Sequence, residues 1–293
     1  MKTLMTLHNQ KHLDDVLMYT DGILLGNNLF GTRLTNSFSI EEIIEIARQT
    51  KKHHKLCFLI ANQIMTDDEL DSFSQWMDQI DTSIFDGIIV ADLGVIMLLK
   101  EKGLAHQIIY NPETLITNDY DFNFLHTLGI QGVYAAKEIT LEDVKRIGTN
   151  KSLSLFLVGH GHLNMFYSKR QLIKNYSDYL GKNLHLHQAQ DLTLIEEKRL
   201  DEPYPILEDI AGTHVFRSNV LSSMKVYDEL TAFIDYFVID TLFKDDVYGH
   251  MVSKMYHQKQ TELIDLLQEN YHESWDDGFY FKKTIYKSKE VIK

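Results

Sequence analysis

Short apolar runs alternate along the chain with longer stretches in which apolar residues recur every three or four positions. The short runs are four to eight residues long and are rich in branched side chains, which is typical of buried β-strands. They predict eight strands, at Thr3–Leu7, Asp21–Leu25, Lys55–Ala61, Phe85–Ala91, His106–Tyr110, Gly129–Ala136, Ser152–Val158 and Tyr236–Ile239.

The stretches between these runs predict amphipathic helices at Ile40–His53, Asp67–Ile80, Leu93–Lys102 and Leu141–Ile147. Ser39 and Thr140 are expected N-caps, and Glu42 completes a capping box with Ser39. Towards the C-terminus the pattern predicts a helical segment over Asn219–Phe233 and one long helix over Met251–Tyr271.

Alternating strands and helices predict an α/β protein with parallel strands and right-handed crossovers. Eight such strands fit a (β/α)8 TIM-barrel-like fold, regular or distorted. The alternation breaks between His160 and Asn219, where β-like runs indicate an α+β lobe inserted after the seventh strand, over the C-terminal mouth. The predicted organisation is residues 1–159 for the first seven strands, 160–218 for the inserted arm and β lobe, and 219–293 for barrel completion and a C-terminal helix.

Composition limits the function classes. The 293 residues include 29 Lys and Arg against 42 Asp and Glu, a net charge of −13 that disfavours a broad nucleic-acid-binding surface. A single cysteine, Cys57, can form neither an internal disulfide nor a cysteine-ligated iron–sulfur or zinc site. No secretion signal and no apolar run of about 20 residues is present, so we expect a cytoplasmic protein with no membrane partner.

Polar residues follow nearly every predicted strand. In a barrel these positions converge on one mouth, where barrel enzymes keep their sites, although turns favour Asn and Asp in any case. The candidate catalytic residues are Asp92, Glu138 and His160. The candidate ligand-binding residues are Arg33, Asn62, Asn111, Lys137, His162 and Tyr167, with the planar Arg33 fork suited to carboxylate or phosphate.

Other chemistry has weaker support. His160 and His162, with His185 and His187, could in principle bind a metal, but paired histidines at a strand end are more often hydrogen-bonded structure. No HExxH motif supports a metal site, so none is predicted. There is no GxSxG serine elbow and no phosphate-binding glycine loop.

Several segments together resemble the collagenase-like peptidase family U-32. They are Phe30-Gly31-Thr32-Arg33, the run from Asp86 to Val95, Asn111-Pro112-Glu113 with Asn118, Lys137-Glu138-Ile139-Thr140-Leu141, Tyr204-Pro205-Ile206 with Glu208-Asp209, and His160-Gly161 with Tyr167-Ser168-Lys169-Arg170. The family pattern has cysteines where this chain carries Asn164 and Gln171, near Leu184 or Gln188, and at Ser222. In cysteine-bearing relatives, such residues hold an iron–sulfur cluster used to hydroxylate tRNA, ribosomal RNA or ubiquinone precursors.

The chain resembles a short, cysteine-free type within this family that accompanies a longer cysteine-bearing paralogue. The resemblance implies a part in 5-hydroxyuridine formation at the tRNA wobble position. It also implies the paralogue as partner, with tRNA bound through the complex of the two proteins. It implies no iron–sulfur cluster in this chain and a prephenate-like anionic metabolite as a possible ligand. Two alternatives stay open, namely a collagenase-like protease and a non-catalytic scaffold for the paralogue.

Overall fold

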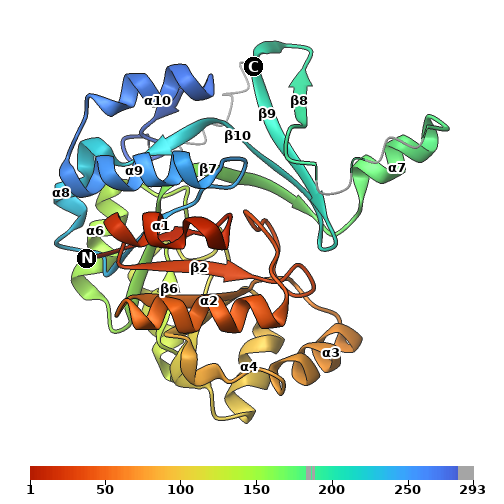
Figure 1. Ribbon diagram of the computed structural model, residues 1–293, viewed down its shortest axis with the longest axis vertical. Coiled ribbons are helices and arrows are strands. Elements are labelled where there is room, and N and C mark those ends of the chain that lie inside the picture. Colours follow the sequence, from red (N-terminus) through yellow and green to blue (C-terminus); the bar gives the residue numbers. More distant parts are fainter. Residues whose placement is uncertain (183–185, 187–188, 283–293) are drawn as a thin grey trace, which may run out of the picture.

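A computed structural model describes residues 1–182, 186 and 189–282. Eight parallel strands close into a barrel because β7 pairs with β6 on one side and β11 on the other (Figure 1). Its strands are β1 Lys2–Thr6, β2 Gly22–Gly26, β3 Leu56–Ala61, β4 Gly87–Val90, β5 Ile108–Tyr110, β6 Gly132–Tyr134, β7 Ser154–Ser168 and β11 Tyr236–Ile239. The predicted TIM-barrel-like fold and all eight predicted strands are confirmed.

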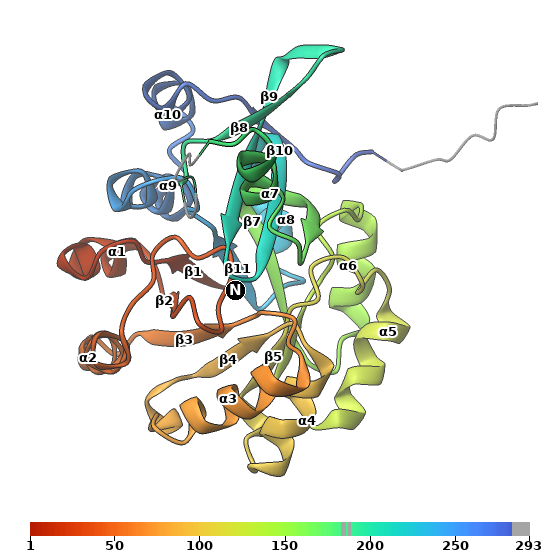
Figure 2. The ribbon, with the colours of Figure 1, turned by 90° about the vertical axis from the view of Figure 1, so that its right-hand side faces the viewer.

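Helices surround the barrel, as Figure 2 shows from one side. The expected helices form as α2 Ile40–Lys52, α3 Asp67–Met77, α4 Leu93–Glu101 and α6 Leu141–Asn150, and the Ser39–Glu42 capping box is present. The others are α1 Leu13–Tyr19, α5 Asp119–Phe124, α8 Tyr227–Leu230, α9 Asp246–Gln258 and α10 Leu263–Tyr271. None of the helices in the described residues has the length and apolar character needed to cross a bilayer.

Two helix predictions near the C-terminus are wrong. The expected single helix over Met251–Tyr271 is two helices, because Lys259 adopts a left-handed conformation (φ 56°) that ends α9. The expected helix over Asn219–Phe233 begins instead as the end of β10 (Gly212–Ser222). Strand pairing with β7 overrides the local helical pattern there, and only the short α8 remains.

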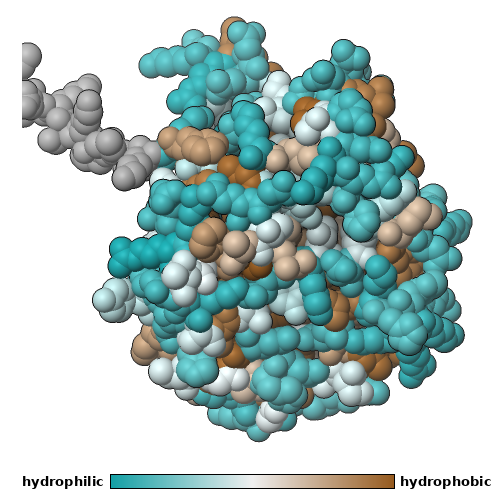
Figure 3. All heavy atoms as spheres, turned by 90° about the vertical axis from the view of Figure 1, so that its left-hand side faces the viewer, coloured by the Kyte–Doolittle hydropathy of each residue, from teal (hydrophilic) through white to brown (hydrophobic). Residues whose placement is uncertain are grey.

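Two apolar cores hold the barrel. Inward-facing residues fill its interior, and the Phe156 ring stacks on Tyr236 at 4.2 Å and on Tyr134 at 5.1 Å. A larger core lies between the strands and the surrounding helices. On the face shown in Figure 3, hydrophilic side chains predominate and apolar ones are scattered. Because side chains fill the barrel interior, a ligand site is expected at the end of the barrel.

The strand β7 continues from the barrel into the inserted α+β lobe. The strand was expected to stop at Val158 but continues to Ser168, where it pairs antiparallel with β10. β10 pairs with β9 (Arg199–Asp209), whose first half pairs with β8 (Thr193–Glu196). The helix α7 (Leu172–Tyr179) stands beside this sheet, away from the barrel (Figure 1).

A β-bulge marks the point where β7 leaves the barrel wall. The register with β11 shifts between Val158 and His160, so Gly159 is the extra residue. A Cβ on Gly159 would lie 1.9 Å from the Phe237 ring, and Gly161 has a φ of 131°. Only glycine fits both positions, and the bulge changes which side of the strand the following residues face.

Candidate ligand site at the barrel mouth

Two adjoining cavities open at the C-terminal ends of the strands. The inner cavity, of about 60 Å³, lies directly above the barrel interior. The outer cavity, of about 300 Å³, lies beside it under the lobe. Both are lined by Thr32, Arg33, Asn62, Glu113 and Asn164, so these five residues form the partition between the two spaces.

An ion-pair cluster stands at this partition. The Arg33 guanidinium lies 3.0 Å from Glu113 Oε1, and the Lys137 ammonium contacts Glu113 Oε2. The Arg33 and Lys137 side chains are only 11% and 8% exposed, whereas that of Glu113 is 21% exposed. Both Arg33 (φ 55°) and Glu113 (φ 68°) have left-handed backbones, a strained state that costs roughly 1–3 kcal/mol per residue and persists where surrounding contacts enforce it.

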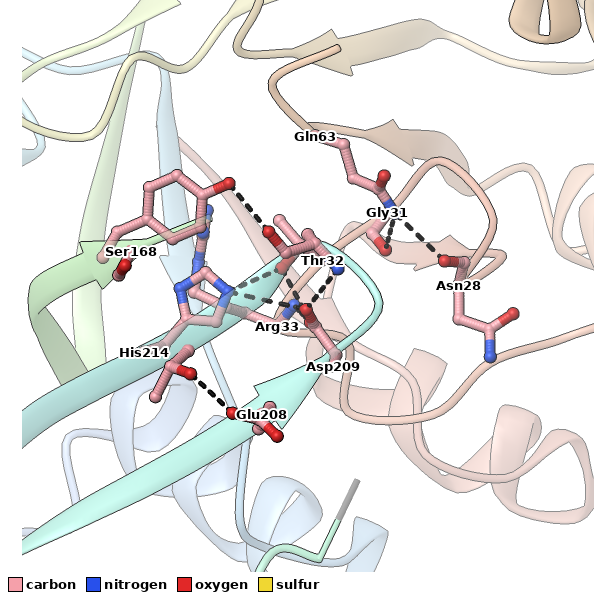
Figure 4. A network of polar contacts seen from close by, with 12 residues as sticks. Asn28, Gly31, Thr32, Arg33, Gln63, Ser168, Glu208, Asp209 and His214 are labelled. Atoms are coloured by element: carbon pink, nitrogen blue, oxygen red, sulfur yellow. Dashed lines mark hydrogen bonds and ion pairs between the residues drawn. The ribbon is translucent and has the colours of Figure 1, made fainter. Parts of the chain in front are cut away.

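Asp209 of the lobe holds the Arg33 loop in this conformation. Figure 4 shows Thr32 and His214 beside the Asp209 side chain. Its Oδ2 accepts hydrogen bonds from Thr32 Oγ1 at 2.7 Å and from the Arg33 amide at 3.0 Å. Burial alone would raise the Asp209 pKa, but hydrogen bonds from His214, the Arg33 amide and Thr32 lower it to about 2. The lobe therefore positions a residue of the barrel mouth.

Two further contacts fix the same loop. Asn62 at the end of β3 accepts a hydrogen bond from the Thr32 amide at 2.9 Å. Gln63 donates through Nε2 to the carbonyls of Asn28 at 3.0 Å and Gly31 at 3.2 Å (Figure 4). The backbone of the Arg33 loop is thus held by side chains other than Glu113.

Burial perturbs the charged groups of the cluster. It lowers the Lys137 pKa well below its usual range, assisted by the positive charge of Arg33 and opposed by Asp240 and Glu138. Burial likewise lowers the Arg33 pKa and raises that of Asp240, which lines the inner cavity at the end of β11. The inner cavity is thus lined by two poorly hydrated basic side chains, Arg33 and Lys137, and by the carboxyl groups of Glu113 and Asp240.

The structure brings all six predicted ligand-binding residues to these cavities. The inner cavity is lined by Arg33, Asn62, Asn111, Lys137 and His162, and the outer one by Tyr167. His162 donates through Nδ1 to the Arg217 carbonyl at 2.9 Å, which leaves Nε2 as an acceptor. Tyr167 donates to the Ala211 carbonyl at 2.9 Å and stacks on His214 at 4.8 Å. Their binding role remains a prediction.

The three candidate catalytic residues lie elsewhere. His160 is fully buried outside the barrel wall, with Nε2 2.8 Å from the Tyr248 hydroxyl and Nδ1 3.3 Å from that of Tyr256. Asp92 is the N-cap of α4, accepting from the amides of Gly94 and Val95. Glu138 is exposed next to Lys137. None of the three lines either cavity.

Glu113, Asp209, His214 and Thr32 were not singled out as site residues from the sequence. Glu113 sits in the segment after β5, and a carboxylate directly behind Pro112 could have drawn attention to it. Asp209 and His214 reach the mouth from the inserted lobe, more than 170 residues from Thr32, with which both form hydrogen bonds. The residues next to Asp209 and His214 in the sequence do not indicate that these two side chains contact a residue so far away along the chain.

The residues at the family's cysteine positions do not fit an iron–sulfur cluster. With its amide nitrogen turned inward, Asn164 donates to the carbonyls of Phe166 at 2.8 Å and Val215 at 3.1 Å. Ser222 lies 3.3 Å from the Tyr256 hydroxyl, and Gln171 is the N-cap residue of α7. Amides and hydroxyls do not replace thiolates as cluster ligands. Cys57 is buried in β3, where burial raises its pKa.

Metal binding has no support in the described part of the chain, where no group of three His, Cys, Asp or Glu side chains is arranged to hold an ion. His160 and His162 also diverge, since one packs outside the barrel and the other lines the inner cavity. His185, His187, Leu184 and Gln188, which were considered as further ligand positions, lie outside the described residues.

Comparison with known proteins settles the family. Residues 9–288 match the family model described as Peptidase family U32. The chain belongs to this family. U32 membership agrees with the resemblance inferred from the sequence segments around Arg33, Asp92, Lys137 and His160.

Among curated U32 relatives, tRNA hydroxylation protein P2 of Bacillus subtilis (strain 168) is 29% identical over 286 residues, covering 90% of this chain and 91% of that protein. tRNA hydroxylation protein P1 of the same organism is 21% identical over 157 residues, which span 53% of this chain and 37% of that longer protein. The chain is therefore a U32 member related to tRNA hydroxylation proteins.

The solved structure of a U32 peptidase superposes with a TM-score of 0.52, covering 81% of this chain and 92% of that one. At 14% sequence identity this likeness concerns the fold alone. It agrees with the barrel seen here.

Proposed function

We propose that this protein is the ligand-binding subunit of a system that hydroxylates the tRNA wobble uridine at carbon 5. In this proposal it binds a small anionic metabolite at the barrel mouth, and a longer cysteine-bearing U32 paralogue supplies the iron–sulfur chemistry and the tRNA contact. The system would work in the cytoplasm, where tRNA is modified. The observation that carries the proposal is the buried pair of cations, Arg33 and Lys137, beside two cavities.

The cluster suits a carboxylate ligand. Arg33 offers a planar fork of donors and Lys137 a point charge, and both are poorly hydrated. The outer cavity adds apolar and aromatic walls from Tyr110, Phe166 and Tyr167. Together the spaces reach the lower end of the volumes typical of metabolite sites, about 300 Å³. An anion with an apolar or unsaturated body, such as prephenate, fits this chemistry.

Glu113 occupies the position that such a ligand would take. Its carboxylate pairs with both cations in the free protein. It is the most exposed of the three side chains and belongs to the loop that lines the outer cavity. A carboxylate ligand would enter by displacing Glu113 from Arg33 and Lys137, so ligand charge would be a condition for binding.

The division of labour rests on chemistry that this chain lacks. The net charge of −13 disfavours a broad RNA surface, and the cysteine positions carry residues that cannot ligate a cluster. The relation to tRNA hydroxylation proteins P1 and P2 supports the choice of reaction.

A binding experiment tests the ligand half of the proposal. Purified protein would be titrated with prephenate, malate and phenylpyruvate in a calorimeter, with the Arg33→Ala, Lys137→Ala double variant as comparison. We expect micromolar binding of at least one carboxylate to the wild type and none to the variant. Equal affinity for both proteins, with both shown to be folded, would place the ligand elsewhere.

A genetic experiment tests the reaction. Deleting the gene should remove 5-hydroxyuridine from total tRNA, measured by nucleoside mass spectrometry, and the wild-type gene should restore it. Restoration by the Arg33→Ala, Lys137→Ala variant would favour the scaffold alternative. Unchanged 5-hydroxyuridine in the deletion strain would refute the hydroxylation proposal.

The protease alternative has less support. His160, a candidate catalytic residue, is buried with both ring nitrogens engaged and does not line either cavity. Cleavage of gelatin by the purified wild-type protein, lost in the Arg33→Ala, Lys137→Ala variant, would revive that alternative.

A further inference from the structure

The far end of the lobe is a two-stranded hairpin that the other described residues leave exposed. All eleven residues from 193 to 203, here named the β8–β9 tip, are exposed. Only past Pro203 does β9 begin to pack, with Tyr204 buried, and its pairing with β10 starts at Ile206. Figures 1 and 2 show the tip standing away from the barrel.

Such a hairpin gains little stability from its own contacts. An isolated two-stranded hairpin is marginally stable at best in water, because it buries too little apolar surface. In addition, β8 is the last strand of its sheet, so its outer edge offers unpaired backbone groups to another strand. Both features are typical of a surface that another chain covers.

The tip also exposes apolar side chains at close spacing. Leu194 is 46% exposed, Ile195 55% and Leu200 69%. Single exposed apolar residues need no explanation, but the tip carries three within seven residues, which makes it a candidate contact. Around them stand four carboxylates and two cations, a net charge of −2.

The charged side chains of the β8–β9 tip limit which kinds of molecule can bind to it. Glu197, Asp201, Glu202 and Lys198 have no ion-pair partner among the described residues, which leaves a net charge of −2, whereas Arg199 is engaged by Glu196 at 3.3 Å and by the Tyr204 hydroxyl at 2.9 Å. An RNA backbone would be repelled by these carboxylates. A second copy of the same tip would bring like charges together, which disfavours self-association.

We infer that the β8–β9 tip docks a different protein chain, whose contacting surface carries Lys and Arg around an apolar strip and adds a strand to β8. The inference rests on the proposed function in one respect: the partner that handles tRNA must itself be cationic. It goes further by naming the surface through which the two chains meet.

The sequence offers a clean way to test this contact. Cys57 is the chain's only cysteine and is fully buried, so a single engineered cysteine on the surface would be the reactive thiol. Ile195→Cys places it on the tip. Met97→Cys on α4 is the matched control, because Met97 is 51% exposed and α4 lies at the opposite end of the molecule from β8 in Figure 1.

Each variant would carry a photo-crosslinker on its cysteine and be mixed with the purified cysteine-bearing U32 paralogue of the same organism. We expect Ile195→Cys to crosslink to the paralogue and Met97→Cys not to. Crosslinking only from Met97→Cys, or from Ile195→Cys only to a second copy of this chain, would overturn the inference.

Charge reversal tests the chemistry of the contact. The Glu196→Lys, Glu197→Lys double variant should bind the paralogue at least tenfold more weakly than wild type, and raising salt from 50 to 300 mM should weaken the wild-type complex. Glu41→Lys, Glu45→Lys on α2 reverses two exposed charges away from the tip and should change neither affinity nor salt dependence. Circular dichroism would confirm that all variants are folded.

The outcomes separate the two proposals. A wild-type complex that the tip variants leave unchanged would refute the docking surface while the proposed function stands. Failure of wild type to bind the paralogue, by calorimetry and size exclusion, would remove the docking inference. It would leave the carboxylate-binding and tRNA experiments to decide the rest.

Discussion

Two buried polar clusters flank the bulge in β7, and they differ in charge and in free space. One surrounds His160 outside the barrel wall, and the other joins Arg33, Glu113 and Lys137 at the mouth. Both contain residues that the sequence marked as candidates for chemistry. Of the two, only the second lines the cavities at the barrel mouth.

The His160 cluster is complete in itself. The Tyr248 hydroxyl donates to Glu273 at 2.8 Å, so His160 Nε2 must donate to the Tyr248 oxygen, and Nδ1 is left to accept from Tyr256. Trp275 packs edge-on at 4.7 Å. Burial lowers the His160 pKa to about 3, helped by His162 and Lys244, and the ring stays neutral. Such a network specifies structure.

The mouth cluster is incomplete by comparison. Its two cations share one carboxylate on a strained, partly exposed loop, and cavity space lies on both sides. The comparison teaches that burial and hydrogen bonding alone do not mark a functional site. The adjacent cavities distinguish the proposed binding cluster from the structural one.

The largest expected effect is a pH dependence of stability that belongs to His160. The unfolded chain takes up this proton below about pH 6.5, whereas the folded protein does so only near pH 3. The free energy of unfolding therefore decreases as the pH falls through this window, by about 3 kcal/mol between pH 7 and pH 4. Urea denaturation at a series of pH values measures it.

His160→Gln is the control for this prediction, since glutamine keeps a hydrogen-bonding group but does not titrate. The variant should show a flatter pH profile between pH 4 and pH 6.5. Carboxylate binding at pH 7 should be unchanged, because His160 lies outside the cavities. A large loss of carboxylate affinity in the folded His160→Gln variant would show that the His160 cluster also contributes to ligand binding.

The next effect concerns affinity. Lys137→Met keeps the length of the side chain but removes the charge, so the ligand would lose an ion pair in a poorly hydrated site. We expect carboxylate affinity to fall about 100-fold, or about 2.7 kcal/mol, as measured by calorimetry. Lys100→Met on the outer face of α4 should bind as wild type does. Unaltered affinity in Lys137→Met would count against the mouth as the ligand site.

A smaller effect is expected for the lobe residue Asp209. Its pKa lies at about 2 instead of 3.8, so its ionised form stabilises the fold above about pH 4, and this stabilisation is lost as the pH falls towards 2. Asp209→Asn should lower the free energy of unfolding at pH 7 by about 2 kcal/mol. The variant should also lack the part of the wild-type acid sensitivity that lies below pH 4.

The smallest effect has the opposite sign. Glu113→Gln removes the carboxylate that competes with the ligand for Arg33 and Lys137, so carboxylate affinity should rise about tenfold, or about 1.4 kcal/mol. Glu138→Gln, which changes an exposed neighbour of Lys137, should have little effect. Weaker binding by Glu113→Gln would mean that Glu113 contacts the ligand instead of yielding to it.

Much of the fold could be read from local pattern. Each barrel strand is a short apolar run that must be buried on both faces, and helix N-termini such as that of α2 carry their own capping residues. The six predicted ligand-binding residues reach the mouth because parallel strands of a barrel end at one side. The C-terminal helices were misjudged where strand pairing and a left-handed Lys259 overrode the periodicity.

The sequence by itself determined the barrel, its polar mouth and the absence of cluster-ligating cysteines, because these depend on residue type and on a strand period that repeats locally. Only the tertiary structure decided which side of the wall His160 faces, since one extra residue at Gly159 reverses the alternation of β7. It alone brought Glu113 to the cations and Asp209 to the Arg33 loop. Those contacts join distant segments, and their partners are set by packing of the whole chain.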